Sequence, residues 1–290
     1  KQGLATIRAK VVIDCSGDAD VAYFAGAETL METVEPRMPN TTLLNFANVT
    51  PEQVRRSNMR DISKRANEKY PLLPRGWGMG PVANSHMYYS NHTGTKTIGQ
   101  FDMTDPFERS DAECVGRRQA VQIAQAMREF GGEDLKNVEL VGTSPQICVR
   151  ETRRLKGLYI LTEEDAAEGR TFEDTIGWRS GYLDLMGYKY TKMRIHDVPY
   201  RALLPVEVDG LLTAGRSISA THVGMAAGKS MGNCVATGHA AGLAAAISTK
   251  QGIMPREVKV AESQDALRRD GVDLTVGGTV QENVSSDRRA

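Results

Sequence analysis

The chain has 290 residues and carries 36 basic and 36 acidic side chains, so its formal net charge is zero. This balance gives no electrostatic reason to expect nucleic acid or an acidic membrane surface as a partner. Apolar residues make up 40% of the chain, which suits a globular protein of about two domains. No apolar run approaches the roughly 18 residues that cross a bilayer.

Strand and helix signals alternate along the first quarter of the chain. A strand is predicted over residues 7–14, where a continuous apolar run is typical of a strand covered on both faces. Gly17 then turns the chain, and Asp18 is placed to cap a helix that ends at the next glycine. A second strand is expected over residues 41–49. A helix follows over residues 50–69, opened by a cap, a proline and a capping-box glutamine.

The segment 71–99 is rich in Gly, Pro, Asn and Ser and contains Trp77, Tyr88 and Tyr89. Loops of this composition usually meander over the surface. Aromatic residues on loops also line pockets, so a wall that faces a substrate is the second interpretation.

The rest of the chain continues the same mixture of helices and strands, with a capping-box signal at residues 110–113 and a further helix start at Thr162. The predicted elements are helix 110–130, strand 138–141, helix 162–169, extended segment 199–204, strand 211–214, helix 228–249 and helix 262–269. The last ten or so residues are polar and glycine-rich, and we expect them to be loose.

The four cysteines form no C-x-x-C pair, so neither a zinc site nor a disulfide framework is predicted. The simplest expectation is a reducing, cytoplasmic setting for a soluble protein. No signal peptide appears, but Lys1 is not a natural start and a buried-type strand follows within about ten residues. We therefore expect that a segment upstream has been lost or cut off.

Several motifs occur in an order that resembles a known family. They are VVIDCSGDADVAYFAGAE at 11–28, the helix at 111–130, PQICVRETRRLKGLYILTEEDAAEGRTFEDTIG at 145–177, VPYRALLPVEVDGLLTAGRSISATHVG at 198–224, and TGHAAG at 237–242. Over roughly residues 1 to 270 the chain resembles FAD-dependent oxidoreductases of the glutathione-reductase type, and most closely a bacterial, xanthan-lyase-like group.

One element of that family is absent from the sequence. The family begins with a strand and a G-x-G-x-x-G turn that holds the FAD pyrophosphate. No such motif occurs here, because Gly76, Gly78 and Gly80 give only G-x-G-x-G on a loop. The resemblance therefore implies the C-terminal two-thirds of a flavoprotein. The missing FAD-binding segment would belong to the same protein or to a partner chain.

The fold class implied by the resemblance is α/β. Part of a Rossmann-like, FAD-binding parallel sheet is expected, with a mixed α+β substrate-binding or cap domain inserted in it. The expected boundaries are 1–30 for the first part of the FAD-binding domain, 31–200 for the inserted domain, 201–250 for the return to the FAD-binding domain, and 251–290 for a C-terminal helix and tail.

Three segments are implied to contact FAD. The turn after the first strand corresponds to the A-T-G-D element of the family, the Gly-Arg turn at 215–216 to its second FAD motif, and the small-residue helix would point its start at the flavin. The implied residues are Ser16, Gly17, Asp18, Gly215, Arg216, Ser217, Gly232, Asn233 and Thr237.

Each of these segments also has a purely structural interpretation. The first turn can be an ordinary strand-to-helix turn capped by Asp18, and Arg216 can form a surface ion pair. The glycine helix can be a plain buried helix. Relatives usually carry Arg where Lys229 stands, which weakens any bidentate contact there.

The remaining candidates are charged and titratable groups. Arg150 and Arg153, in the cluster V-R-E-T-R-R, would bind an anionic substrate, or they form a structural Arg–Glu network. His222 is the catalytic acid–base candidate, since it lies between the Gly-Arg turn and the glycine helix, and His196 is a weaker candidate. A structural role is the alternative for both. The other histidines, His86, His92 and His239, are interpreted as structural, and no metal site is predicted.

The predicted function is that of an FAD-dependent oxidoreductase that transfers a hydride between a small organic substrate and flavin. The alternative is an auxiliary, non-catalytic subunit that keeps the fold without its own nucleotide site. A polysaccharide lyase rests on a family label alone. A partner chain that carries the missing segment is expected, a homo-oligomer is compatible with the sequence, and neither nucleic acid nor membrane is expected as a partner.

Overall fold

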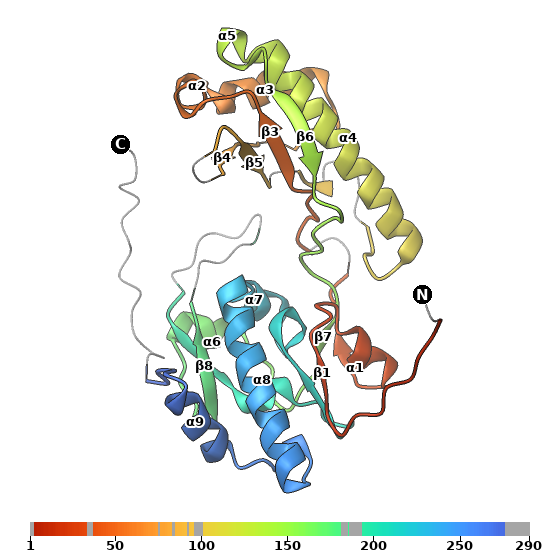
Figure 1. Cartoon of the computed structure of the whole chain (residues 1–290), viewed down its shortest axis with the longest axis vertical. Coiled ribbons are helices and arrows are strands. Elements are labelled where there is room, and N and C mark those ends of the chain that lie inside the picture. The colour runs from red at the N-terminus through yellow and green to blue at the C-terminus, as the bar shows by residue number, and fades with distance from the viewer. Residues whose placement is uncertain are drawn as a thin grey trace. The chain divides into compact units, whose positions relative to one another are not determined.

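The computed structural model describes residues 3–33, 37–74, 76–82, 85–91, 93–95, 101–180, 185 and 193–275. The chain forms two compact units, shown in Figure 1. Unit 1 combines residues 1–32 with 153–290, and unit 2 comprises residues 33–152. The inserted unit is thus shorter than the predicted range 31–200, because the residues that follow 152 pack with unit 1. No helix in the described part of the chain is both long and apolar enough to cross a membrane.

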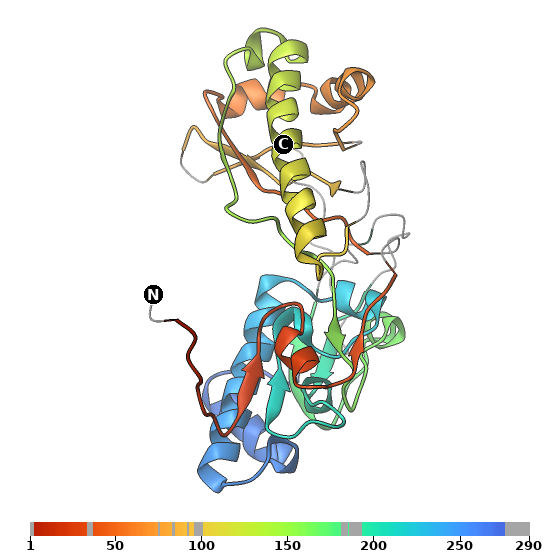
Figure 2. The same ribbon diagram turned by 90° about the vertical axis from the view of Figure 1, so that its right-hand side faces the viewer.

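The parallel pairing in unit 1 joins two segments far apart in the sequence. Strand β1 (Val12–Asp14) lies beside strand β10 (Leu211–Thr213), with Asp14 opposite Thr213, as Figure 2 shows. The predicted strand 7–14 is therefore too long at its start. Leu4 and Ile7 are almost fully exposed, so no neighbouring strand or helix covers them. Their side chains therefore bury no apolar surface that would stabilise a strand here.

Two antiparallel pairs complete the strands described in unit 1. Strand β2 (Thr29–Leu30) pairs with β7 (Arg154–Leu155), and β8 (Thr175–Arg179) pairs with β9 (His196–Pro199). Unit 1 is therefore mixed α/β with small sheets, as expected. Within the described residues, parallel pairing of strands is limited to β1 and β10, so the predicted part of a Rossmann-like parallel sheet is represented only by this pair.

Four helices described in unit 1 lie within a few residues of their predicted ranges, and a fifth, over residues 222–226, was not predicted. They are α1 (Asp20–Phe24), α6 (Glu163–Glu168), α7 (His222–Ala226), α8 (Met231–Gln251) and α9 (Val260–Arg269). Helix α8 packs against β8, β1 and α9. The predicted extended segment 199–204 is wrong, because Tyr200–Leu203 forms a 3-10 turn that buries Tyr200 and lets its hydroxyl donate to Pro255 O at 2.8 Å.

A buried cation joins β8 to helix α7. Arg179 is 2% exposed, and its guanidinium donates to three backbone carbonyls at the end of α7, those of Gly224, Met225 and Gly228. A Cβ atom at Gly228 would lie 2.0 Å from Arg179 Nε, so only glycine fits there. Burial lowers the pKa of Arg179 to about 10, which still leaves it protonated at neutral pH.

Unit 2 is built on a four-stranded antiparallel sheet in the order β4 (Gly80–Pro81), β5 (Tyr88–Ser90), β3 (Leu44–Ala47) and β6 (Glu139–Thr143). Its helices are α2 (Pro51–Arg56), α3 (Met59–Lys69), α4 (Pro106–Phe130) and α5 (Gly132–Leu135). The apolar faces of α3, α4 and the sheet enclose one core that includes Phe46, Ile62, Trp77, Tyr88 and Met127. This is the mixed α+β architecture expected for the inserted domain.

Two helix boundaries in unit 2 differ from the prediction. The capping box of Thr50 and Gln53 forms as predicted, but the helix ends at Arg56. Asn58 accepts a hydrogen bond from Asp61 N at 3.1 Å and so caps a second helix, α3. Helix α4 starts before the predicted residue 110, because Asp105 accepts from the amides of Phe107 and Glu108. In both cases the free amides are captured by the side-chain oxygen of a residue that was not predicted to cap a helix.

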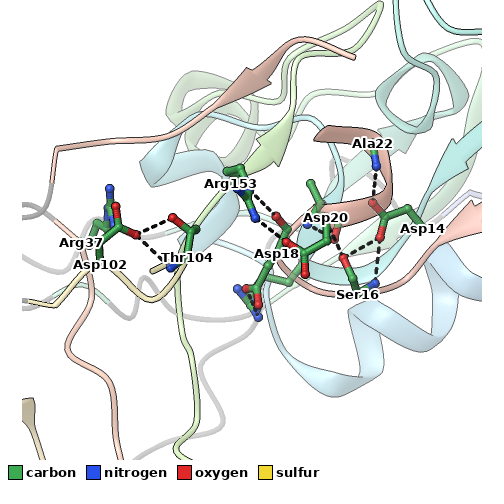
Figure 3. Close-up of polar contacts among 12 residues, drawn as sticks. Asp14, Ser16, Asp18, Asp20, Ala22, Arg37, Asp102, Thr104 and Arg153 are labelled. Carbon is green, nitrogen blue, oxygen red and sulfur yellow. Dashed lines mark hydrogen bonds and ion pairs between the residues drawn. The ribbon is translucent and has the colours of Figure 1, made fainter. Parts of the chain in front are cut away.

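A short polar chain stands at one end of α4. Arg37 is 3.2 Å from Asp102, and the same carboxylate accepts from the amide and hydroxyl of Thr104, as Figure 3 shows. Burial opposes ionisation of Asp102, but the Thr104 hydrogen bonds and the charge of Arg37 outweigh it and hold its pKa below the ordinary value. We assign these contacts to the structure of unit 2, because they order the start of its longest helix.

Candidate functional site

Two glycine turns meet at the carboxyl ends of β1 and β10. The strands are parallel and adjacent, and Ala214 N donates to Asp14 O at 3.0 Å just before the second turn. Gly17 has a φ of +83° and Gly215 a φ of +70°, a conformation that L side chains rarely adopt. The carboxyl ends of parallel strands are where α/β sheets bind ligands. The sequence prediction that these two distant turns fold together is supported by this geometry.

Asp14 organises the first turn, although it is not among the predicted site residues. Its carboxylate is fully buried and accepts from Ser16 N at 2.9 Å, Ser16 Oγ at 2.7 Å and Ala22 N at 2.9 Å, as Figure 3 shows. The carboxylate thereby joins the strand end, the turn and helix α1. The sequence did contain a signal for this role, because Asp14 ends an apolar strand. A carboxylate buried at such a place needs several hydrogen-bond donors around it.

The second turn packs on the first through Arg216. A Cβ atom at Gly17 would lie 2.7 Å from Arg216 Nη2, so the guanidinium occupies the space that a side chain would need. The same nitrogen lies 2.9 Å from Asp18 Oδ1, and both side chains are mostly buried. Ala19 N donates to the buried Ser217 Oγ at 3.2 Å. The turns therefore share an ion pair and a hydrogen bond.

The structure corrects the predicted cap of α1. Ala19, with a φ of 51°, holds the cap position and has no side chain that could cap the helix, so Ser16 Oγ and the Asp14 carboxylate accept from the first-turn amides of Asp20 and Ala22 instead. Asp18 is pulled away from that role by its ion pair with Arg216. The structural alternative for Arg216, a surface ion pair, is therefore partly correct. Arg216 does form an ion pair, but the pair is mostly buried between the two turns.

Arg153 also belongs to the first turn. Its Nε donates to Asp18 O at 3.2 Å, its guanidinium forms an ion pair with Asp20, and it lies 4.4 Å from the centre of the Tyr23 ring. Figure 3 shows Arg153 reaching toward Asp18 and Asp20. Arg150 belongs to unit 2, so the two arginines of the V-R-E-T-R-R cluster lie on either side of the unit boundary.

The second turn is tied to helix α8 by Thr237. Gly215 N donates to Thr237 Oγ1 at 2.9 Å, and that hydroxyl is 3.1 Å from the carbonyls of Asn233 and Cys234, to which it donates in turn. Asn233 donates to Ser180 O at 3.2 Å. Both predicted residues therefore hold the helix against the turn and the end of β8.

The start of α8 is open on one side. Ser230 stands at the cap position, but its side chain accepts no hydrogen bond from the first turn, and that turn contains no acidic residue. Met231 is 86% exposed, and nothing lies within 4 Å of a Cβ atom placed at Gly232. The amides of a helix start carry partial positive charge, so this end suits a polar or anionic group that approaches closely.

The two histidine candidates differ in environment. His222 is partly exposed and is the first residue of α7, which Thr221 caps by accepting from Gly224 N at 3.1 Å. His196 is 1% exposed and lies opposite Arg179 in the β8–β9 pair. Burial, and then the charge of Arg179, lower the pKa of His196 to about 4. His196 is therefore neutral at physiological pH and has no access to a substrate from solvent.

We expect His196 to make the stability of unit 1 depend on pH. Its pKa is lowered in the folded state, so between 6.5 and about 4 the unfolded chain binds a proton that the folded chain does not. The free energy of unfolding should fall by roughly 3 kcal/mol across this window as the pH decreases. Urea unfolding of wild type and His196→Gln at several pH values measures this, and equal pH dependence of the two proteins would contradict it.

Cys15 follows β1 directly and is exposed, but its environment does not activate it. Partial burial, the charge of Asp14 and then Cys234 raise the pKa of the Cys15 thiol. A thiol with a raised pKa is a weaker nucleophile at neutral pH, because less thiolate is present. The chemistry of this site is therefore not that of an activated cysteine.

These features define a mixed α/β unit in which two glycine turns meet at the carboxyl ends of neighbouring parallel strands. The chain matches the family described as FAD dependent oxidoreductase over residues 1–267, and it belongs to that family. No curated protein and no solved structure matches the chain. The family and its cofactor FAD, both inferred from the sequence, are confirmed. The turns fit such a cofactor in their place, because both left-handed glycines stand at the carboxyl ends of neighbouring parallel strands, where α/β sheets bind ligands.

Proposed function

We propose that this chain is a flavin oxidoreductase that transfers a hydride between a small organic substrate and FAD held at the two glycine turns. The observation that supports this most is the joining of the turns. Gly17 and Gly215 both adopt left-handed conformations at the ends of neighbouring parallel strands, and Asp18 and Arg216 connect them at 2.9 Å. When bound, the flavin ring accepts or donates the hydride.

The residues of the turns have separate roles in this proposal. Gly215 lets the backbone of the second turn approach the cofactor, and Gly17 shapes the first turn and leaves room for the Arg216 guanidinium. Ser16 and Ser217 fix the two turns by hydrogen bonds with Asp14 and Ala19. Arg216 orients the first turn through Asp18, and we propose that its positive charge lies near the cofactor.

Helix α8 supplies the electrostatic part of the site. Its uncapped first turn, with Gly232 and the buried Asn233, faces no acidic neighbour within that turn. A helix start stabilises negative charge nearby. Thr237 keeps the helix in place against Gly215. We propose that this helix start stabilises the charge that accumulates on the ring during reduction.

We propose two arginines as contacts for an anionic substrate, because of their positive charge. Arg153 bonds with Asp20, whose side chain is 43% exposed, so an anionic substrate would compete with that carboxylate for the guanidinium. Arg150, the second cation of the cluster, is proposed as a further contact. An anionic substrate gains most from Arg because its fork matches a carboxylate.

His222 is proposed to hold and release the proton that accompanies hydride transfer, because it is the accessible histidine near the start of α8 along the chain. His222→Ala should keep bound FAD and slow reduction of the flavin by about a hundredfold or more, as expected for loss of a general acid or base. Rapid mixing with a substrate that reduces the wild type measures this rate. His239→Ala is the control, and an unchanged rate in His222→Ala would exclude the role.

We also propose that a segment bearing the glycine fingerprint, in a partner chain or in the same protein, joins unit 1 to complete FAD binding. Helix α1 exposes apolar side chains, since Val21 is 42%, Tyr23 49% and Phe24 82% exposed. An apolar cluster of this kind gains free energy when another element covers it. A second copy of this chain could cover the same side chains instead. Sedimentation of the purified chain alone distinguishes the two cases, because only self-association gives a dimer without a different chain.

Purification tests the function directly. A yellow preparation with a flavin absorption spectrum, whose bound FAD is reduced by an organic substrate, supports the oxidoreductase. A colourless preparation that stays colourless with FAD added, and that associates with an intact flavoprotein partner, supports the auxiliary, non-catalytic subunit instead.

A further inference from the structure

Two cysteines of unit 1 border the second glycine turn. Cys15 directly follows β1 and is exposed, and Cys234 lies near the start of α8 and is partly exposed. The other two cysteines, Cys114 and Cys148, belong to unit 2. All four thiols are free in the structure. Unit 1 therefore carries two free thiols that come from segments far apart in the sequence.

The pairing of β1 with β10 brings Cys15 to this turn. Asp14 lies opposite Thr213, and Ala214 N donates to Asp14 O at 3.0 Å, so Cys15 is the neighbour of Ala214 at the carboxyl end of the pair. Neighbouring strands lie about 4.8 Å apart. The backbone of Cys15 is therefore about 5 Å from the residue that precedes Gly215.

Helix α8 brings Cys234 to the same turn. A Cβ atom at Gly215 would lie 3.6 Å from Cys234 Sγ, which is ordinary van der Waals contact. Gly215 N donates to Thr237 Oγ1 at 2.9 Å and so holds the helix and the turn together. Cys234 also contributes to the raised pKa of the Cys15 thiol, an effect that acts only between groups close in space. The two thiols are thus near each other in the folded chain.

We propose that Cys15 and Cys234 form a reversible disulfide that joins the end of β1 to helix α8 beside the second glycine turn. A disulfide requires Cα atoms within about 7 Å of each other. Both cysteines neighbour residues 214–215, and Cys15 begins a turn rather than lying within the strand. A small shift of this turn would therefore close the bond and leave the strand pair intact. The bond is independent of the flavin reaction and does not require FAD.

Oxidised glutathione is the oxidant in the proposed reaction. The exposed Cys15, as thiolate, attacks one sulfur of the glutathione disulfide, and the first glutathione leaves as a thiolate that takes up a proton. Cys234, as thiolate, then attacks the Cys15 sulfur and releases the second glutathione. Two protein thiols are oxidised to one disulfide, and one glutathione disulfide is reduced to two thiols. Because the pKa of Cys15 is raised, we expect the first step to be slow at neutral pH.

Mass spectrometry of the full chain tests for this bond. The protein is incubated with oxidised glutathione at about pH 8, then quenched and digested with pepsin in acid, where disulfides exchange slowly because little thiolate is present. A peptide pair that contains Cys15 and Cys234 should be joined before treatment with dithiothreitol and separate afterwards. Glutathione attached to Cys15 without any Cys15–Cys234 pair would overturn the proposal, because Cys234 would then be out of reach.

Variants and an unfolded sample identify the cause of the bond. In Cys234→Ser, glutathione should remain on Cys15, because no second thiol displaces it. The double variant Cys114→Ser/Cys148→Ser removes the thiols of unit 2 and should form the bond as the wild type does. In urea the yield of the Cys15–Cys234 pair should fall about tenfold or more, since a long flexible chain then separates the two residues.

Two further results would contradict the proposal. A yield in urea equal to that of the folded chain would show that the fold does not bring the thiols together. Loss of the bond in the unit 2 double variant would show that it arises by exchange with those cysteines. All of these measurements are made without FAD, so a negative result leaves the proposed flavin function untouched.

Discussion

We expect Gly215→Val to bind no FAD. Gly215 has a φ of +70° and its amide donates to Thr237, so valine, with its branched side chain, must either strain the backbone or move the turn. Either change displaces the backbone that faces the cofactor and breaks the link to α8. The ratio of flavin absorbance to protein absorbance, after incubation with FAD under conditions that saturate the wild type, measures the loss.

Gly252→Val provides a matched control. Gly252 ends helix α8 with a φ of +71° and has open space around its Cβ position, so the backbone strain is similar while the glycine turns are untouched. This variant should lose stability and keep FAD. If both variants lose FAD equally, general destabilisation explains the result. If Gly215→Val retains flavin at wild-type occupancy, the second turn does not contact the cofactor.

Asp14→Ala should produce the largest loss of stability among the variants of unit 1. Three donors, two from Ser16 and one from Ala22, lose a buried carboxylate that alanine cannot replace, and two of the three are backbone amides. The free energy of unfolding should fall by roughly 3 kcal/mol, and FAD binding should weaken with it. Urea unfolding in a Trp77→Phe background measures this, because Trp178 then reports on unit 1 alone.

Two further variants make that result interpretable. Asp14→Asn keeps one oxygen acceptor and should be intermediate, because an amide nitrogen cannot accept from the Ala22 amide. Asp209→Ala removes a carboxylate whose side chain is 59% exposed in its pair with Arg256, so it should cost less than about 1 kcal/mol. Similar losses for Asp14→Ala and Asp209→Ala would show that the buried carboxylate does not organise the turn.

The elements of the fold were largely predictable, and the exceptions have local causes. Capping boxes at Thr50 and Thr162 mark helix starts in the sequence and form as expected. The break between α2 and α3 was not predicted, because it depends on whether Asn58 bonds forward to the helix or faces solvent. The length of β1 depends on how far its neighbour β10 extends, and the residue pattern within 7–14 carries no information about that neighbour.

The candidate site was predictable in its glycines and not in its side-chain contacts. Gly17 and Gly215 stand out in the sequence because each follows a short apolar strand. Their contact depends on the pairing of β1 with β10, which the family resemblance implied and local patterns did not. The pairing of Asp18 with Arg216 and the burial of Asp14 are tertiary properties, since several acidic residues could have served either turn.

The packing of Arg179 against Gly228 constrains how this protein can evolve. The backbone of residue 228 touches the guanidinium so closely that any side chain there collides with it. The arginine in turn satisfies three carbonyls that would otherwise be left without donors. A lineage can therefore acquire a larger residue at position 228 only after position 179 has shortened, and descendants should carry the two changes together or neither of them.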